Sequence, residues 1–228
     1  MKNPQRGFTL VEIAIVLVII GLLLGGILKG QEMITQAKIK NVIADFSGIS
    51  AAYHGYQDRY RAIPGDDLQA GGRWNMAPAA VPGDGNGVVA GTYQNGGAQC
   101  TTASEACNWW DHLRRAGFVS GTGVNQPFNA VGGIIGVQTG DGVPPNPGPT
   151  LLNAAGGNGF VGLIVCSANL PDKIAIAVDT QMDDGQSATG TVRALLQNLT
   201  NQPVGAGQIA TATYQETGTN TYVLCRQL

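Results

Sequence analysis

The pattern of apolar and polar positions divides the first 60 residues into two stretches. Residues 8–28 are almost uniformly apolar and contain one charged residue, Glu12. Further on, apolar side chains recur at spacings of three and four: Ile39, Val42, Ile43, Phe46, Ile49, Tyr53, Tyr56 and Tyr60. This spacing places them on one face of a helix. Because no proline lies between residues 8 and 60, we predict one long helix that ends before Pro64.

Beyond this helix, short apolar runs alternate with segments rich in Gly, Pro and Asn. Residues 105–116 are predicted to form a short helix. Runs rich in Val, Ile, Thr and Tyr predict strands at residues 160–166, 174–178, 191–196, 209–214 and 221–225, although residues 192–199 also suit a short helix. Residues 64–100 and 120–158 are predicted to be irregular connecting segments. The sequence therefore predicts an α+β fold, in which the second half of the long helix packs on a C-terminal antiparallel sheet.

The apolar stretch is long enough to cross a membrane as a helix. Lys2 and Arg6 precede it, which favours a cytoplasmic N-terminus. A cleaved secretory signal is disfavoured, because its apolar core is shorter and ends in a small-residue cleavage site that is missing here. A plain membrane anchor accounts for the length but not for Glu12, since a charge near the centre of a membrane helix costs about 2.5–3.5 kcal/mol. Glu12 is therefore a candidate functional residue.

Residues 6–12 read RGFTLVE and lead directly into the apolar stretch. This motif resembles the class III signal of type IV pilins and type II secretion pseudopilins. The resemblance implies that a prepilin peptidase cuts between Gly7 and Phe8 and methylates the new amino group of Phe8. It also implies that Glu12 pairs with the N-terminus of a neighbouring subunit. An ammonium and a carboxylate in hydrocarbon lower each other's cost when subunits bring them together.

The resemblance divides the chain into four expected parts. Residues 1–7 are a cleaved leader, residues 8–30 span the membrane or line a filament core, residues 31–62 are the amphipathic half of the helix, and residues 63–228 form a periplasmic or extracellular head. The family often has Pro where this chain has Lys29, and several glycines lie nearby, at positions 21, 25, 26 and 30. These glycines suit either local unwinding in a filament or close helix approach.

Composition narrows the functional classes. The net charge is −2, only 12% of residues are charged, and no basic cluster is present, so we expect no nucleic-acid partner. No nucleophile elbow, zinc-protease motif or phosphate loop occurs, and neither His54 nor His112 belongs to a catalytic pattern. The sequence therefore predicts a protein that is not an enzyme.

Four cysteines, Cys100, Cys107, Cys166 and Cys225, suit disulfides in a chain exported from the cytoplasm. Of the three possible pairings we favour Cys100 with Cys107, as a local loop, and Cys166 with Cys225, as a long clasp. A zinc site is disfavoured because the spacings match no common finger.

Two acidic segments are candidate calcium sites, although no cofactor is required by the sequence. Residues 83–87 read GDGNG, which resembles part of a calcium loop but lacks its closing Glu. Asp179, Asp183 and Asp184 place three carboxylates on one segment. Solvated turns, which Asp-Gly sequences favour, explain both segments without calcium.

The function that we expect is a structural subunit of a type IV pilus or related filament. Its partners would be the prepilin peptidase, other pilin or pseudopilin subunits and an assembly platform in the inner membrane. The precursor would cross the inner membrane once, and the mature subunit would reach a pilus at the cell surface or a periplasmic pseudopilus. One alternative is a pseudopilin of a type II secretion system. Another is a membrane-anchored or pilus-tip binding module, in which Trp109, Trp110 and the loops at residues 120–158 recognise a glycan or surface, although tryptophans more commonly serve as core residues.

Overall fold

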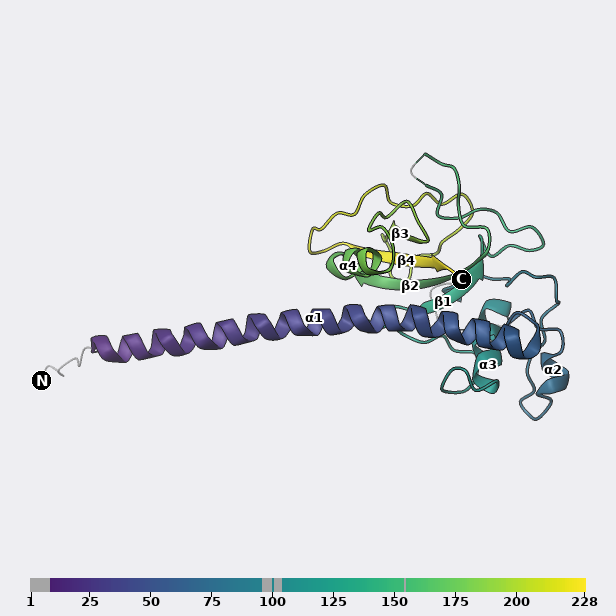
Figure 1. The fold of residues 1–228 in the computed structure, drawn as a ribbon, viewed down its shortest axis with the longest axis horizontal. Helices are drawn as coiled ribbons and strands as arrows, with labels where there is room; N and C mark the ends of the chain where they lie inside the picture. Colours follow the sequence, from purple (N-terminus) through teal and green to yellow (C-terminus); the bar gives the residue numbers. More distant parts are fainter. Residues whose placement is uncertain (1–8, 96–99, 101–103, 154) are drawn as a thin grey trace, which may run out of the picture. The chain divides into compact units, whose positions relative to one another are not determined.

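The computed structural model describes residues 9–95, 100, 104–153 and 155–228. Its helices are α1 (Leu10–Tyr60), α2 (Ala70–Arg73), α3 (Glu105–Arg115) and α4 (Asp172–Met182). Its strands are β1 (Ile135–Thr139), β2 (Leu163–Pro171), β3 (Val192–Leu196) and β4 (Thr221–Gln227). This arrangement, coloured along the chain in Figure 1, is the predicted α+β class: a long N-terminal helix followed by an antiparallel sheet.

The chain forms two compact units, Met1–Lys38 and Ile39–Leu228, and the boundary falls inside the sequence of α1. In the first unit, the described residues from Thr9 to Lys29 are all exposed. An 18-residue window there has a mean hydropathy of 2.8, and α1 is the one helix in the described part of the chain that is long and apolar enough to cross a membrane. The structure therefore has an apolar helical stretch whose side chains are not covered by any described residue of the same unit.

The second unit is built on the apolar face that the spacing of residues 39–60 predicts. Ile39, Val42, Phe46, Ile49, Tyr53 and Tyr56 are buried, and Ile43 and Tyr60 are partly buried. They share one core cluster with Trp109, Trp110 and Leu113 of α3 and with one face of the sheet. Both tryptophans are fully buried core residues, so they form no surface platform for a sugar.

The sheet has the strand order β1-β2-β4-β3, and every neighbouring pair is antiparallel. In β4, Tyr222 and Leu224 face the core cluster that contains α1 residues, whereas Val223 and Cys225 face a second cluster. Loop residues such as Tyr93, Leu151 and Val204 complete this second cluster. Both faces of the sheet are therefore buried, one beneath helices and the other beneath loops; Figure 1 shows α4 beside the sheet.

Two predicted strands differ from the structure, and a third is confirmed. Residues 174–178 were predicted as a strand but lie within helix α4, because Ile174, Ala175 and Val178 are buried at a helical spacing. Residues 209–214 form only an isolated bridge, between Ile209 and Leu152. The strand predicted at residues 191–196 is confirmed as β3, and residues 192–199 contain no helix.

Strand β1 and helix α2 lie in regions predicted to be connections. In β1, Gly136 permits close packing, because a Cβ atom there would lie 1.9 Å from the carbonyl oxygen of Tyr93. Glycine therefore serves as a strand residue here, although its enrichment elsewhere marks loops.

Both favoured disulfides are present. Cys100 pairs with Cys107 at a Cα–Cα distance of 5.7 Å, and Cys166 pairs with Cys225 at 4.0 Å. Cys166 in β2 lies directly opposite Cys225 in β4, so the second bond joins the two central strands. The first bond ties the preceding loop to α3.

Candidate functional site

Helix α1 begins with a capping box formed by Thr9 and Glu12. The N–H of Glu12 donates to Oγ1 of Thr9 at 3.3 Å, and the N–H of Thr9 donates to Oε2 of Glu12 at 2.8 Å. The Thr9 hydroxyl donates to the same Oε2 at 2.9 Å. These reciprocal bonds satisfy backbone donors that a helix start otherwise leaves free.

The capping box gives Glu12 a role that the sequence reasoning missed, although the Thr-x-x-Glu spacing carries the signal. Both hydrogen bonds that Thr9 donates to Glu12 end on Oε2, and no described residue donates to Oε1. Oε1 can therefore accept a hydrogen bond from a donor outside the described part of the chain. The large apolar side chains that precede and follow Glu12 in the sequence are exposed; Leu10, for example, is 91% exposed. The predicted cleavage and methylation residues, Gly7 and Phe8, lie outside the described residues.

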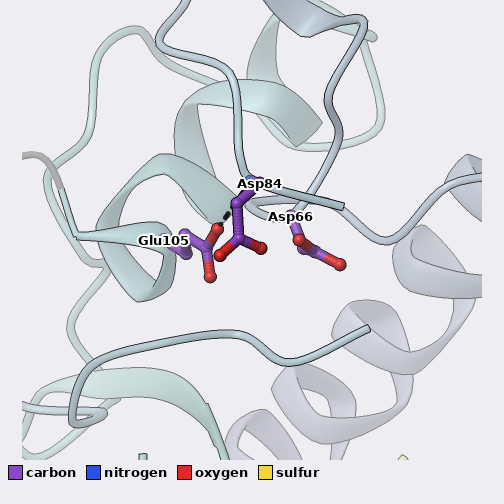
Figure 2. Close-up of side chains that lie close together, drawn as sticks. All are labelled: Asp66, Asp84 and Glu105. Carbon is purple, nitrogen blue, oxygen red and sulfur yellow. Dashed lines mark hydrogen bonds between the residues drawn. The ribbon is translucent and has the colours of Figure 1, made fainter. Parts of the chain in front are cut away.

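A first acidic cluster joins Asp66, Asp84 and Glu105, which come from three separate segments (Figure 2). The carboxylate of Asp66 accepts the N–H groups of Gly85 at 2.6 Å and of Gly87 at 2.7 Å. The glycine-rich loop therefore wraps the side chain of Asp66, and only Asp84 of this loop joins the cluster. The sequence reasoning missed Asp66 and Glu105, because no local spacing connects them to the loop.

Glu105 closes this first cluster and is also held by backbone donors. Its two carboxylate oxygens accept the N–H groups of Asp84 at 3.1 Å and Ala90 at 2.9 Å. Burial raises the pKa of Glu105, these backbone donors lower it, and the negative charges of Asp66 and Asp84 add to the increase. Burial also raises the pKa of Asp66, against the lowering effect of its backbone donors. The cluster thus fixes the loop to the start of α3.

A second acidic cluster contains the three predicted residues Asp179, Asp183 and Asp184, each of which places a carboxylate oxygen within 4.8 Å of the others. Asp179 is fully buried in α4, and its Oδ2 accepts the hydroxyl of Tyr214 at 2.6 Å. Burial raises its pKa to about 6; the Tyr214 hydrogen bond lowers the pKa, and the charges of Asp184 and Asp183 raise it further. The structure therefore brings together the residues that the sequence singled out.

Residues 2–28 match the family model of the prokaryotic N-terminal methylation motif. The chain carries the signature of type IV pilin and pseudopilin precursors. The matched segment includes the RGFTLVE run and ends with the apolar stretch. Comparisons with curated proteins and with solved structures gave no match.

The motif implies processing of this pilin-like precursor by a prepilin peptidase and assembly with other pilin subunits. Its apolar helix fits anchoring of the precursor in the inner membrane. Pilin subunits are generally structural rather than enzymatic. The match covers the capping box and Glu12, so the N-terminal part of α1 is the candidate site of assembly.

Proposed function

We propose that the chain is a structural subunit of a type IV pilus or a related filament, assembled through the N-terminal part of α1 after removal of residues 1–7. The observation that carries the proposal is one acid, Glu12, in an exposed apolar helix that matches the methylation motif. Apolar side chains supply most of the attraction between subunits in water, and close packing supplies it in the membrane.

In this proposal, Glu12 sets the position of one subunit against the next. Its Oε1 receives the methylated ammonium of Phe8 from a neighbouring subunit, while its Oε2 keeps the capping box with Thr9. A charge-assisted bond of this kind is stronger than a neutral one, especially where water is excluded. Glu12 therefore serves helix capping and subunit docking through different oxygens.

The test separates these two roles with Glu12→Gln. Glutamine also forms a capping box, so this variant keeps the helix start. Its amide oxygen can accept from Thr9, whereas its NH2 group replaces Oε1 and removes both the negative charge and the acceptor that docking requires. We expect a mature N-terminus that begins at methylated Phe8, together with at least a tenfold loss from sheared surface filaments, measured by mass spectrometry and immunoblotting. The matched control is Glu32→Gln, which removes another exposed acid of α1, one that is paired with Lys29. Normal incorporation of the Glu12 variant would overturn the docking role.

The proposal places the mature subunit in a surface pilus, and a periplasmic pseudopilus is the second candidate. Protein identification in sheared filaments distinguishes the two. Recovery of the chain from surface filaments supports the pilus, whereas recovery only from the periplasmic face of the inner membrane supports a pseudopilin. We do not propose a binding module in the head, because Trp109 and Trp110 are buried and cannot form the sugar platform on which that alternative partly depended.

A further inference from the structure

The second acidic cluster lies where α4 ends and the segment leading to β3 begins. Asp183 and Asp184 are the first residues of this segment, the α4–β3 loop (residues 183–191), and Asp179 lies one turn earlier in α4. Asp183 accepts the N–H of Val192 at 2.9 Å, and Asp184 accepts the hydroxyl of Thr189 at 2.6 Å. The carboxylates therefore converge on a closed loop that their own hydrogen bonds shape.

One oxygen of this cluster has no partner. The Asp179 side chain is fully buried, and its Oδ1 accepts no hydrogen bond within the described part of the chain. A buried acceptor left unpaired costs about 1–3 kcal/mol, and more when it is charged. The hydroxyl of Tyr214 donates to Oδ2, and the backbone N–H of Gly185 lowers the pKa of the same carboxyl. Oδ1 is the oxygen left without a hydrogen bond among the described residues, and it is the atom that we assign to a ligand.

No side-chain cation among the described residues forms an ion pair with these carboxylates. None of the ion pairs between described residues involves Asp179, Asp183 or Asp184. Arg193 is the positive group that influences Asp183, but its guanidinium donates to the carbonyl of Leu151 and lies 4.6 Å from the ring centre of Phe160. Within the described part of the chain, the three close carboxylates are therefore not neutralised by an ion pair.

We propose that Asp179, Asp183 and Asp184 bind one Ca²⁺ ion, which fastens the end of α4 to the α4–β3 loop. The donor set contains only oxygen, which suits a hard cation and not zinc. Calcium accepts irregular sets of six to eight oxygen ligands at about 2.3–2.6 Å, whereas magnesium requires near-ideal octahedral geometry at about 2.0–2.1 Å and gives up its water reluctantly. Three carboxylates on a helix end and its following loop therefore suit calcium better than magnesium.

The first acidic cluster, Asp66, Asp84 and Glu105, differs from the second because its buried carboxylate has no oxygen without a hydrogen bond. Both oxygens of Asp66 and both oxygens of Glu105 accept backbone N–H groups. Its buried carboxylate is therefore already satisfied, and we assign no cation there. This contrast supplies a matched control, because Asp84 and Asp184 are both exposed acids in three-carboxylate clusters.

The experiment titrates the metal-free full-length protein in detergent with CaCl₂ and follows heat release and the thermal unfolding midpoint. We expect one Ca²⁺ per chain and a midpoint that rises with calcium concentration, because a ligand that binds only the folded state stabilises it. Asp184→Asn should weaken binding at least tenfold, whereas Asp84→Asn should leave it unchanged. Magnesium should bind at least tenfold more weakly than calcium.

Three results would overturn the proposal. The first is the absence of calcium heat and of any midpoint change at millimolar calcium in the wild-type protein. The second is loss of binding in Asp84→Asn but not in Asp184→Asn. The third is equal affinity for magnesium, which would contradict the argument from coordination geometry. The wild-type titration decides the first point even if a variant folds poorly.

Discussion

The buried imidazole of His112 shows how a single residue can make the fold sensitive to pH. Its Nδ1 accepts the N–H of Gly65 at 2.9 Å, and its Nε2 lies 2.8 Å from the carbonyl oxygen of Val81. These partners assign the neutral tautomer with the proton on Nε2. Protonation would place a second N–H against the N–H of Gly65. The histidine, which showed no motif in the sequence, thus joins α3 to the turn after α1.

We expect acid to destabilise the protein through His112. Burial lowers the pKa of this side chain, against the raising effects of the Val81 contact and of nearby Asp67 and Asp111. The unfolded chain therefore takes up a proton near pH 6.5 before the folded chain does, and stability falls as the pH drops below that value. From pH 7.5 to 5.5 the free energy of unfolding should fall by about 1 kcal/mol more in the wild-type protein than in His112→Gln.

Urea unfolding at the two pH values measures this difference. Glutamine suits the comparison because it can accept from Gly65 and donate to Val81 without titrating. His54→Gln is the control, since His54 is exposed on α1. Equal pH slopes in the wild-type protein and in His112→Gln would contradict the prediction.

At the scale of elements, burial of both sheet faces explains which parts of the fold the sequence predicts. The α1 face was predictable because a helix with one buried side shows its period in the sequence. Strands buried on both faces show no alternation, so short apolar runs such as residues 174–178 do not distinguish strand from helix. Strand β1 was hidden because Gly136 lies where a neighbouring carbonyl approaches closely.

The two acidic clusters also differ in how far the sequence alone predicts them. Asp179, Asp183 and Asp184 lie within one short segment, so their convergence could be predicted from the sequence. Asp66, Asp84 and Glu105 converge only because the loop wraps Asp66 and α3 begins beside it. Contacts between distant segments depend on tertiary packing, which local spacing does not encode.

The two disulfides should contribute unequally to stability. Cys166 and Cys225 are separated by 59 residues, and Cys100 and Cys107 by 7. In the chain-entropy model these loops correspond to about 4 and about 2 kcal/mol. Replacing Cys166 and Cys225 by alanine should therefore lower the free energy of unfolding by about 2 kcal/mol more than replacing Cys100 and Cys107. Urea unfolding of the two double variants measures this, and a larger loss from the local pair would contradict the entropy argument.

At the scale of the whole molecule, the boundary between the two compact units separates exposed apolar surface from the buried core. Every buried core residue in the described part of the chain is at position 39 or later, whereas the large exposed side chains of residues 10–28 are apolar. The first unit therefore suits a membrane or a filament, and the second has the composition of a domain that folds by itself.

This division predicts that a chain beginning at residue 31 is soluble without detergent and unfolds cooperatively, while the full-length chain requires detergent. The truncation keeps the whole buried face of α1 and both core clusters. Size-exclusion chromatography and urea unfolding measure the result. Phe46→Ala in the truncated chain should lower the free energy of unfolding by about 3–5 kcal/mol, because it removes a buried aromatic side chain. An aggregated or non-cooperative truncated chain would mean that the first unit contributes to folding, contrary to the division proposed from the core.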